Sequence, residues 1–431
     1  MPATHLQQKA HNLSSCYRIK VHSPLMWSVS CFLFLLPCLL SAQDQQGFIY
    51  GKVITVDEKE YTGMIRWGVE EAFWDDLFVS RKATTEALEY LSPQHIQVLR
   101  QKEEPQQLQW DFMSLWNNPL PNHKHAFRCR FGDIRSIEVT GESTARLTFK
   151  DGNLLDVEGG SDVGGKVYVH DTEGERTRLE WERVDKIVFS QTPMTPLPAK
   201  VSALYGTVLT TQGAFTGYIQ WDDEECLSTD QLEGKNEQGK FSFRFGEVSE
   251  IRIEEESARV SLFSGREYLL GGTDDLSERN HGIIVKHMEV GRIFIPWEEF
   301  RFVKFQQQVE VSGPGYDDFL APSALHGNIF TNDGQTFSGK LVFDLDEQLD
   351  IETIEGKQDG IRYFLPLRNI STIERRNHKY CAISLLDGDK LFLGQEHDVS
   401  DDNWGVLVWT DTKERPTYLT WDRIKHIDFD K

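Results

Sequence analysis

The sequence predicts an all-β protein made of three tandem repeats. A closing phrase that begins with tryptophan and ends with phenylalanine occurs three times, at 181–189, 297–305 and 421–429. A glycine-led opening phrase also occurs three times, at 51–55, 206–210 and 327–331. Apolar and polar residues alternate with a period of two after each opening, which indicates strands with one buried face. Phrases that recur in the same order over about a hundred residues indicate a structural module.

The three repeats are expected to fold as separate units. Repeat 1 spans 47–191, repeat 2 spans 203–307 and repeat 3 spans 324–431. The joins at 192–202 and 308–323 are rich in proline, which is typical of linkers between domains. Each repeat is long enough to enclose a core of its own.

Within each repeat, the pattern predicts two similar halves of four or five short strands. In the middle copy, 205–211 and 215–221 alternate on either side of a turn at Gln212 and Gly213, and the pattern resumes from Ala258. Each half ends with apolar residues spaced like Phe300, Val303 and Phe305. This spacing predicts that one turn of 3₁₀ helix redirects the chain before a last strand returns to the same core.

A strand–3₁₀–strand ending is typical of small SH3-like and Sm-like barrels. The run Gly206-x-Val-x-Thr-x-x-Gly-x-x-x-Gly-x-Ile-x-Trp-Asp222 resembles the first two strands of the Sm-like fold. The resemblance covers the first half of every repeat, although repeat 3 has Phe343 for the tryptophan and repeat 1 has Gly68 for the aspartate. It implies barrel-like halves but not RNA binding, because the family's basic and aromatic loop residues do not occur. The chain is also similar to tandem-repeat proteins secreted by bacteria, which implies a setting and no activity.

The alternative fold is a six-bladed β-propeller, in which each half would form one blade. The halves differ in length and the joins between repeats are long. Both observations favour barrel-like halves over blades.

Repeat 1 carries an insertion at 83–124. Two short helices are expected in it, over 84–91 and 92–100, with Ser92 as the N-cap and Pro93 in the first turn. Three aromatic residues follow, Trp110, Phe112 and Trp116. Long insertions in compact domains often carry function. The insertion is therefore either a helical plug over an open edge or a partner-binding site built on these aromatic side chains.

A polar loop recurs about ten residues after the turn glycine in the second half of each repeat. Its residues are Asp162 in repeat 1, Asp275 and Asn280 in repeat 2, and Asp398 and Asn403 in repeat 3. Asp and Asn side chains accept hydrogen bonds from nearby backbone amides, which predicts a self-capping loop. Binding of Ca²⁺ by these residues is the alternative.

An acidic corner follows the second strand of each repeat. Its members are Glu70 and Glu71, residues 222–225, and Asp344, Asp346 and Glu347. These carboxylates lack the alternating order of a calcium loop, so a solvated turn is expected. No nucleophile elbow, P-loop, His-Glu-x-x-His or Cys-x-x-Cys occurs, and the 13 histidines show no ligand spacing.

The N-terminus has the layout of a secretory signal peptide over residues 1–42. Three basic residues precede the apolar run 26–40, and Ser41 and Ala42 offer a cleavage site. The run is shorter than the ~20 residues that span a bilayer. We therefore expect export to the periplasm, cell surface or exterior, from a start at Met1 or Met26, and no membrane insertion after cleavage.

Charge and cysteine content exclude further classes. The net charge is −22, and it becomes −25 when residues 1–42 are removed, so nucleic acid is not an expected partner. The three cysteines outside that segment lie at unmatched positions, Cys129, Cys226 and Cys381, so neither disulfides nor a metal motif is expected. We interpret these three cysteines as small buried residues.

These observations favour an exported, non-enzymatic protein that presents binding surfaces to a protein or glycan partner. Two alternatives stay open. One is a hydrolase that acts on polysaccharide through paired carboxylates. The other is an adhesion module stabilised by Ca²⁺ at the polar loops.

Overall fold

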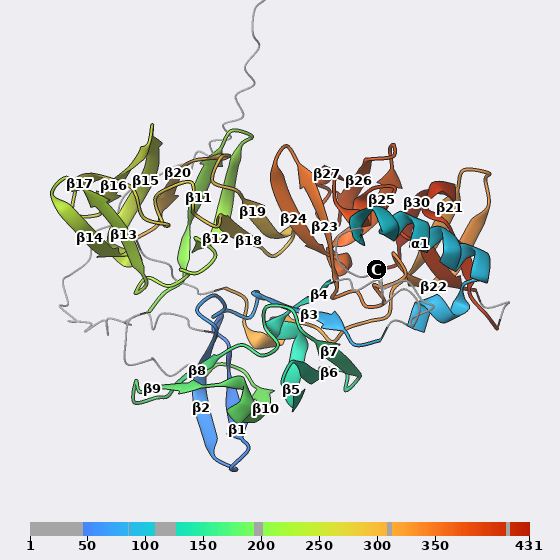
Figure 1. Cartoon of the computed structure of the whole chain (residues 1–431), viewed down its shortest axis with the longest axis horizontal. Coiled ribbons are helices and arrows are strands. Elements are labelled where there is room, and N and C mark those ends of the chain that lie inside the picture. Colours follow the sequence, from blue (N-terminus) through green and yellow to red (C-terminus); the bar gives the residue numbers. More distant parts are fainter. Residues whose placement is uncertain (1–45, 85, 108–125, 194–200, 308–312, 411–413) are drawn as a thin grey trace, which may run out of the picture. The chain divides into compact units, whose positions relative to one another are not determined.

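The computed structural model describes residues 46–84, 86–107, 126–193, 201–307, 313–410 and 414–431, all of which belong to one compact unit that begins at Ala42. The described residues form antiparallel sheets with one α-helix, so the predicted all-β class is confirmed (Figure 1). The signal-peptide prediction falls outside the described residues.

Each repeat contains ten strands. In repeat 1 they are β1 (Tyr50–Thr55), β2 (Glu60–Trp67), β3 (Leu77–Lys82), β4 (Ala126–Arg130), β5 (Ile134–Gly141), β6 (Thr144–Phe149), β7 (Leu154–Glu158), β8 (Val167–His170), β9 (Arg176–Leu179) and β10 (Val184–Phe189). In repeat 2 they are β11 (Leu204–Thr210), β12 (Ala214–Trp221), β13 (Gln231–Asn236), β14 (Gly239–Arg244), β15 (Val248–Glu254), β16 (Ser257–Leu262), β17 (Glu267–Leu270), β18 (Ile283–His287), β19 (Gly291–Ile295) and β20 (Phe300–Phe305). In repeat 3 they are β21 (His326–Thr331), β22 (Thr336–Val342), β23 (Thr353–Gln358), β24 (Ile361–Pro366), β25 (Ile370–Arg375), β26 (Tyr380–Leu385), β27 (Lys390–Gly394), β28 (Val406–Trp409), β29 (Thr417–Leu419) and β30 (Ile424–Phe429).

The opening and closing phrases of each repeat are paired strands. Gly51, Gly206 and Gly327 lie opposite Phe189, Phe305 and Phe429, respectively. A Cβ atom at any of the three glycines would collide with a carbonyl oxygen of the closing strand, which explains why glycine opens every repeat. The closing tryptophans lie 5.8–6.1 Å, between ring centroids, from an aromatic residue at or just after the second strand, in the pairs Trp67–Trp181, Trp221–Trp297 and Phe343–Trp421.

The predicted 3₁₀ turns occur at five of the six half-repeat ends. They are η3 (Phe131–Asp133), η4 (Trp181–Arg183), η5 (Phe245–Glu247), η7 (Leu367–Asn369) and η9 (Trp421–Arg423). Repeat 2 ends instead with a hydrogen-bonded turn, in which the Phe300 N–H donates to the Trp297 carbonyl.

The two halves of a repeat exchange their first hairpins. The strand order in repeat 1 is β4-β3-β7-β6-β5-β10-β1-β2-β8-β9. The first hairpin, β1–β2, therefore joins β8–β10 from the second half, while β6–β7 joins β3–β5 from the first. Repeat 3 pairs its strands in the same order. In repeat 2 the hairpin β13–β14 forms its own sheet, tied to the other strands by a bridge between Lys235 and Gly271.

This exchange corrects the expected shape of the halves. Pairing of β5 with β10, and of β15 and β25 with β20 and β30, continues the ladder across each repeat. Because the hairpins pair across the halves, no ring of strands closes in the described parts of the chain, and the halves are open sheets where barrels were expected. The propeller alternative is wrong for the same reason, since the halves are not separate blades.

The hydrophobic cores are not three isolated bodies. Repeat 1 has a core of its own, but the cores of repeats 2 and 3 form one continuous cluster. The two repeats are joined by pairing of β19 with β24, where Ile293 lies opposite Tyr363. Residues of the second proline-rich join also pack into the repeat 1 core: Tyr316 lies 4.6 Å from Trp74 between ring centroids, and its hydroxyl donates to the Ile134 carbonyl.

The described part of the insertion packs on repeat 3. It forms η1 (Glu86–Tyr90) and α1 (Pro93–Gln107), and the His95 N–H donates to the Ser92 hydroxyl as expected of the N-cap. Leu88 and Leu99 belong to one buried hydrophobic cluster with Val342 and Leu407 of repeat 3. The insertion of one repeat therefore covers another.

Buried ion pairs connect the repeats at equivalent places. Asp76, Asp230 and Glu352 each accept two backbone N–H groups of their own corner. Each also pairs with a cation from another repeat, in the pairs Asp76–Lys286, Asp230–Arg66 and Glu352–Lys82, at 2.5–2.8 Å. In each repeat, one carboxylate thus accepts the hydrogen bonds that fold its own turn and forms an ion pair that joins this turn to another repeat.

The exchange of hairpins predicts how a cleaved chain behaves. We expect a chain cut at a protease site inserted between Glu255 and Glu256, in the exposed turn joining β15 and β16, to stay in one piece. Its fragments remain paired through β11–β20, β12–β18 and β15–β20. Size-exclusion chromatography should show one species in buffer and two fragments only in denaturant. Separation in buffer would mean that the halves fold independently.

Candidate functional site

Five of the nine acids in the acidic corners are buried and only Glu224 is exposed, which corrects the expectation of solvated turns. Asp344 is fully buried, and Glu71, Asp222, Asp346 and Glu347 are at most 8% exposed. The corners fold back tightly, because the residue at Trp67, Trp221 or Phe343 forms a bridge with the glutamate four positions later. This bridge turns Glu71, Glu225 and Glu347 inward at equivalent positions.

The polar loops lie beside these corners and cap the backbone, as predicted for self-capping loops. The carboxylates of Asp162, Asp275 and Asp398 accept the N–H groups of Val79, Glu233 and Glu355 in the third strand of each repeat. The side-chain oxygens of Asn280 and Asn403 accept the N–H groups of Gly282 and Gly405. Their amide nitrogens donate to the Asp275 and Asp398 carbonyls.

Each repeat therefore places a corner glutamate near the loop aspartate, and the pKa values of these acids are raised. The two acids are buried in repeats 1 and 3 and half-buried in repeat 2. Burial, followed by the charge of Asp275, raises the pKa of Glu225 to about 9. Burial and the Asp162 charge raise the pKa of Glu71 well above its usual value. The pKa values of Asp162 and Asp275 rise, chiefly through burial, to about 7 and about 6. Near neutral pH, Glu225 therefore holds a proton.

Only the pair in repeat 1 lines the principal cavity of the described residues, which has a volume of about 240 Å³. Repeat 1 contributes most of the wall, repeat 2 contributes Asp223 and Arg292, and repeat 3 contributes Phe364. The remaining lining residues are Trp67, Gly68, Glu70, Glu71, Leu77, Val79, Arg128, Ser161, Asp162 and Gly165. We call this cavity the inter-repeat pocket.

Two arginines give the inter-repeat pocket positive charge. Arg292 on β19 pairs with Asp223 at 2.8 Å, and its Nε is buried without a hydrogen-bond partner. Arg128 on β4 pairs with Glu355 at 3.1 Å and lies 5.2 Å from the centroid of the Phe364 ring. The pocket thus combines carboxylates, guanidinium groups and aromatic rings.

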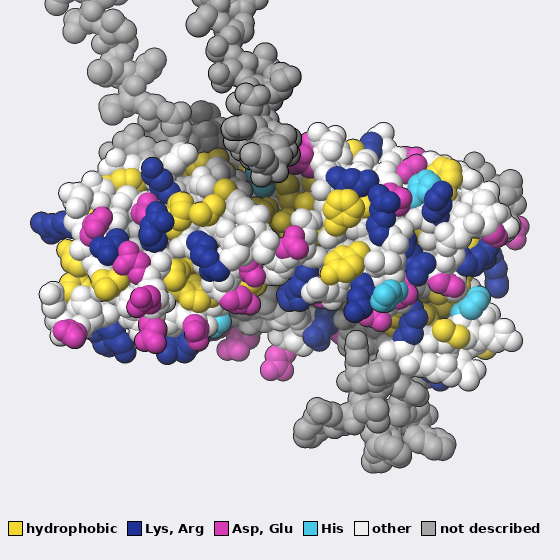
Figure 2. Space-filling model, turned by 90° about the horizontal axis from the view of Figure 1, so that it is seen from above, with side chains coloured by type: hydrophobic (Ala, Val, Ile, Leu, Met, Phe, Trp, Pro, Cys, Tyr) yellow, Lys and Arg dark blue, Asp and Glu magenta, His cyan; other side chains and the backbone are white. Residues whose placement is uncertain are grey.

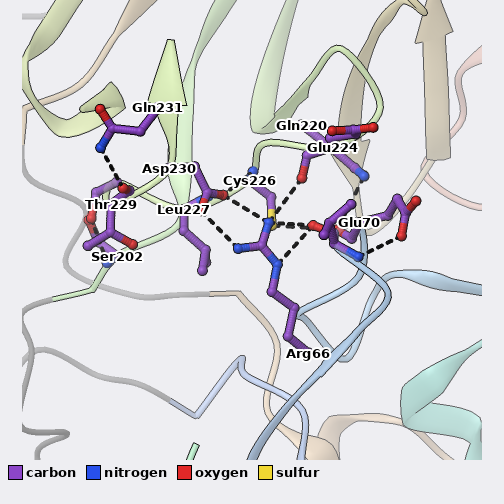
Figure 3. Close-up of polar contacts among 12 residues, drawn as sticks. Arg66, Glu70, Ser202, Gln220, Glu224, Cys226, Leu227, Thr229, Asp230 and Gln231 are labelled. Atoms are coloured by element: carbon purple, nitrogen blue, oxygen red, sulfur yellow. Dashed lines mark hydrogen bonds and ion pairs between the residues drawn. The ribbon is translucent and has the colours of Figure 1, made fainter. Parts of the chain in front are cut away.

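A polar network fixes the corner that carries Glu70 (Figure 3). Arg66 reaches from the end of β2 to both carboxylate oxygens of Asp230, at 2.8 and 3.0 Å, and to the Glu224 carbonyl. The Gln220 amide and the Cys226 thiol both donate to the Glu70 carbonyl. These contacts hold repeats 1 and 2 in place around the pocket.

Repeat 3 contains a second polar group. The Nδ1 atom of His397 lies 2.7 Å from Oδ2 of Asp344, and Asp398 follows His397 in η8 (His397–Val399). One donor atom from each of the three residues lies within 4.8 Å of the other two.

The structure distributes the predicted site residues over several places. Asp162 lines the inter-repeat pocket, and Asp398 belongs to the group in repeat 3. Asp275, Asn280 and Asn403 hold their loops. Trp110, Phe112 and Trp116 lie outside the described residues. The sequence did not identify Arg128, Arg292 and Phe364 as pocket residues, because nothing distinguishes them from other residues of an alternating strand.

The cysteine prediction is confirmed: Cys129, Cys226 and Cys381 are buried free thiols. Over the face visible in Figure 2, positive and negative side chains are interspersed. No helix in the described ranges has the length and apolarity needed to cross a membrane.

Comparison with known proteins identifies no relative. No protein-family model matches the chain. Neither the curated proteins nor the solved structures yield a match.

Proposed function

We propose that this chain is an exported, non-enzymatic binding protein whose inter-repeat pocket takes a glycan. The observation that carries the proposal is the meeting of paired charges and aromatic rings from three repeats in one cavity. The apolar run 26–40 supports export. The strand–3₁₀–strand endings support a relationship to Sm-like and SH3-like modules.

The side chains of the pocket suit a sugar. Carboxylates and guanidinium groups form strong, directional hydrogen bonds with vicinal hydroxyls, and Arg292 has an unpaired Nε to donate. The half-buried ring of Phe364 provides apolar surface for the C–H face of a sugar ring. A volume of about 240 Å³ fits one or two sugar units and not a folded protein surface.

Repetition argues against catalysis by the acid pair. Glu225–Asp275 and Glu347–Asp398 reproduce the Glu71–Asp162 pair, although the inter-repeat pocket is lined only by the pair in repeat 1. A feature present in every repeat is explained by the fold they share. We therefore assign the three Glu–Asp pairs a structural role in the corners of the repeats.

One observation nevertheless favours the hydrolase alternative. Glu71, whose pKa is raised well above its usual value, and Asp162, with a pKa of about 7, face one cavity as an acid and a base would. If the protein is a hydrolase, oligosaccharides incubated with it will be cleaved, and Glu71→Gln will abolish cleavage.

Binding is tested by glycan-array screening followed by titration calorimetry with the best ligand. We expect Arg292→Ala to weaken binding at least about tenfold, because charged hydrogen bonds are lost. The matched control is Arg259→Ala, which removes an exposed arginine of the same repeat and should leave the Kd unchanged. Absence of glycan binding, or equal binding by Arg292→Ala, would refute the proposal.

A further inference from the structure

The group formed by Asp344, His397 and Asp398 is special to repeat 3. Within the described portion of the chain, it is the one set of three or more His, Cys, Asp or Glu side chains whose donor atoms lie close enough together to hold a metal ion. It lies apart from the inter-repeat pocket, whose lining includes none of the three.

A fourth side chain points to a missing ligand. The Oε2 atom of Glu347 is buried without a hydrogen-bond partner, and the residue is 4% exposed. Glu347 forms a bridge with Phe343 across the same tight corner that carries Asp344. A buried acceptor without a donor calls for a partner.

Among the described residues, the buried lysine of this corner is already held by other acids. Lys82 is the buried lysine on this side, and its ammonium is held by Glu352 at 2.5 Å and Asp346 at 3.4 Å. His397 can neutralise one carboxylate at most. A cluster this rich in buried acid must bind protons or a cation.

The other two repeats lack this donor set. By their place before the loop aspartate and after the second strand, Ser161 and Gly68 in repeat 1 replace His397 and Asp344. In repeat 2 the residue before Asp275 is Asp274. The histidine that contacts the corner aspartate Asp222 there is the exposed His281, which joins no group of three metal-ligating side chains in the part of the chain that the structure describes. The loop aspartate binds backbone N–H groups in every repeat, whereas a histidine directly before it occurs only in repeat 3.

We propose that Asp344, His397 and Asp398 bind a divalent transition-metal ion of the zinc class. Glu347, whose carboxylate is not among the donors that already lie within 4.8 Å of one another, would turn toward the ion as a fourth ligand. One imidazole nitrogen with carboxylate oxygens is a donor set that Zn²⁺ accepts, and Ca²⁺ takes oxygen ligands alone. Four protein ligands define a closed, structural site.

The surroundings orient these ligands. The Trp404 N–H donates to Oδ1 of Asp344, and the Glu355 N–H donates to Oδ2 of Asp398. Each of these hydrogen bonds fixes one carboxylate in the way that outer groups orient metal ligands. The His397 side chain is 30% exposed, which gives an ion a route in from solvent.

The test uses the whole protein, stripped with EDTA and titrated with ZnCl₂ against a chromophoric chelator. We expect one equivalent of Zn²⁺ per chain and a higher Tm when zinc is bound. His397→Ala should weaken zinc binding at least about tenfold. The control His281→Ala, which removes the exposed histidine beside Asp222 in repeat 2, should bind zinc like the wild type.

Substitution of Co²⁺ for Zn²⁺ provides a second test in case the alanine variant folds poorly. The wild type should show the intense visible d–d bands of Co²⁺ in a site of low coordination number, and the milder His397→Gln should shift and weaken them. The proposal is overturned if the wild type binds no zinc, if His397→Ala binds it equally well, or if only Ca²⁺ binds.

Discussion

Replacing Lys286 with methionine is expected to lower the free energy of unfolding by about 3–5 kcal/mol, because it leaves buried carboxylates without their cation. Lys286 lies on β18 of repeat 2 with its side chain 4% exposed. Its ammonium contacts Asp76 at 2.6 Å and Asp75 at 3.2 Å, both in the corner of repeat 1. Burial raises the pKa of Asp75 and the charge of Lys286 lowers it, so loss of the lysine leaves burial unopposed.

Urea denaturation followed by tryptophan fluorescence measures this effect. Lys52→Met is the matched control: its pair with Glu60 is exposed, and its loss should change stability by less than about 1 kcal/mol. Adding Asp75→Asn to Lys286→Met should recover part of the lost stability, because one unpaired carboxylate disappears. If Lys286→Met is as stable as the wild type, the junction between repeats 1 and 2 does not depend on this ion pair.

The sequence predicted those features that depend on local pattern or on repetition. The N-cap at Ser92 and the 3₁₀ turns follow from short-range spacing. The opening and closing phrases recur because they pair with each other, with Gly206 opposite Phe305 in a register that leaves no room for a Cβ atom. Repetition thus marked the strand pairs that define the module.

The exchange of hairpins could not be predicted from the same pattern. A strand that alternates apolar and polar residues buries one face whichever neighbour it pairs with. The hairpin β11–β12 therefore needs the same alternating sequence whether it pairs with strands of its own half or with β18 and β20. The choice is made by long-range contacts that the alternation does not encode.

In the candidate site, too, the features set by nearby residues were predicted and those set by distant residues were not. The loops of Asp275 and Asp398 were predicted as self-capping, because their Asn and Gly partners lie a few residues away. The burial of the corners was not predicted, because a run of acids normally marks a solvated turn. What buries them comes from far along the chain: Arg66 and Asp230 are 164 residues apart, and Lys82 and Asp346 are 264 apart.

Replacing Glu225 with glutamine is expected to stabilise the protein at alkaline pH and to have little effect near pH 5. Glu225 has a folded-state pKa of about 9 against 4.5 in the unfolded chain. Between these values the folded state binds a proton that the unfolded state has lost, so stability falls as pH rises through this window. The slope from this group is at most about 1.4 kcal/mol for each pH unit. Glutamine mimics the protonated acid and removes this contribution.

Thermal melts of the wild type and Glu225→Gln from pH 5 to pH 9 provide the measurement. The wild-type Tm should fall with rising pH, because the raised pKa values of Glu71, Asp162 and Asp275 act in the same direction. The two curves should meet near pH 5 and separate progressively as the pH rises toward 9, with the variant higher. The control Glu256→Gln, at an exposed turn of the same repeat, should reproduce the wild-type profile. Parallel curves for Glu225→Gln and the wild type would show that Glu225 is ionised in the folded protein, and that its buried corner is stabilised by something other than a held proton.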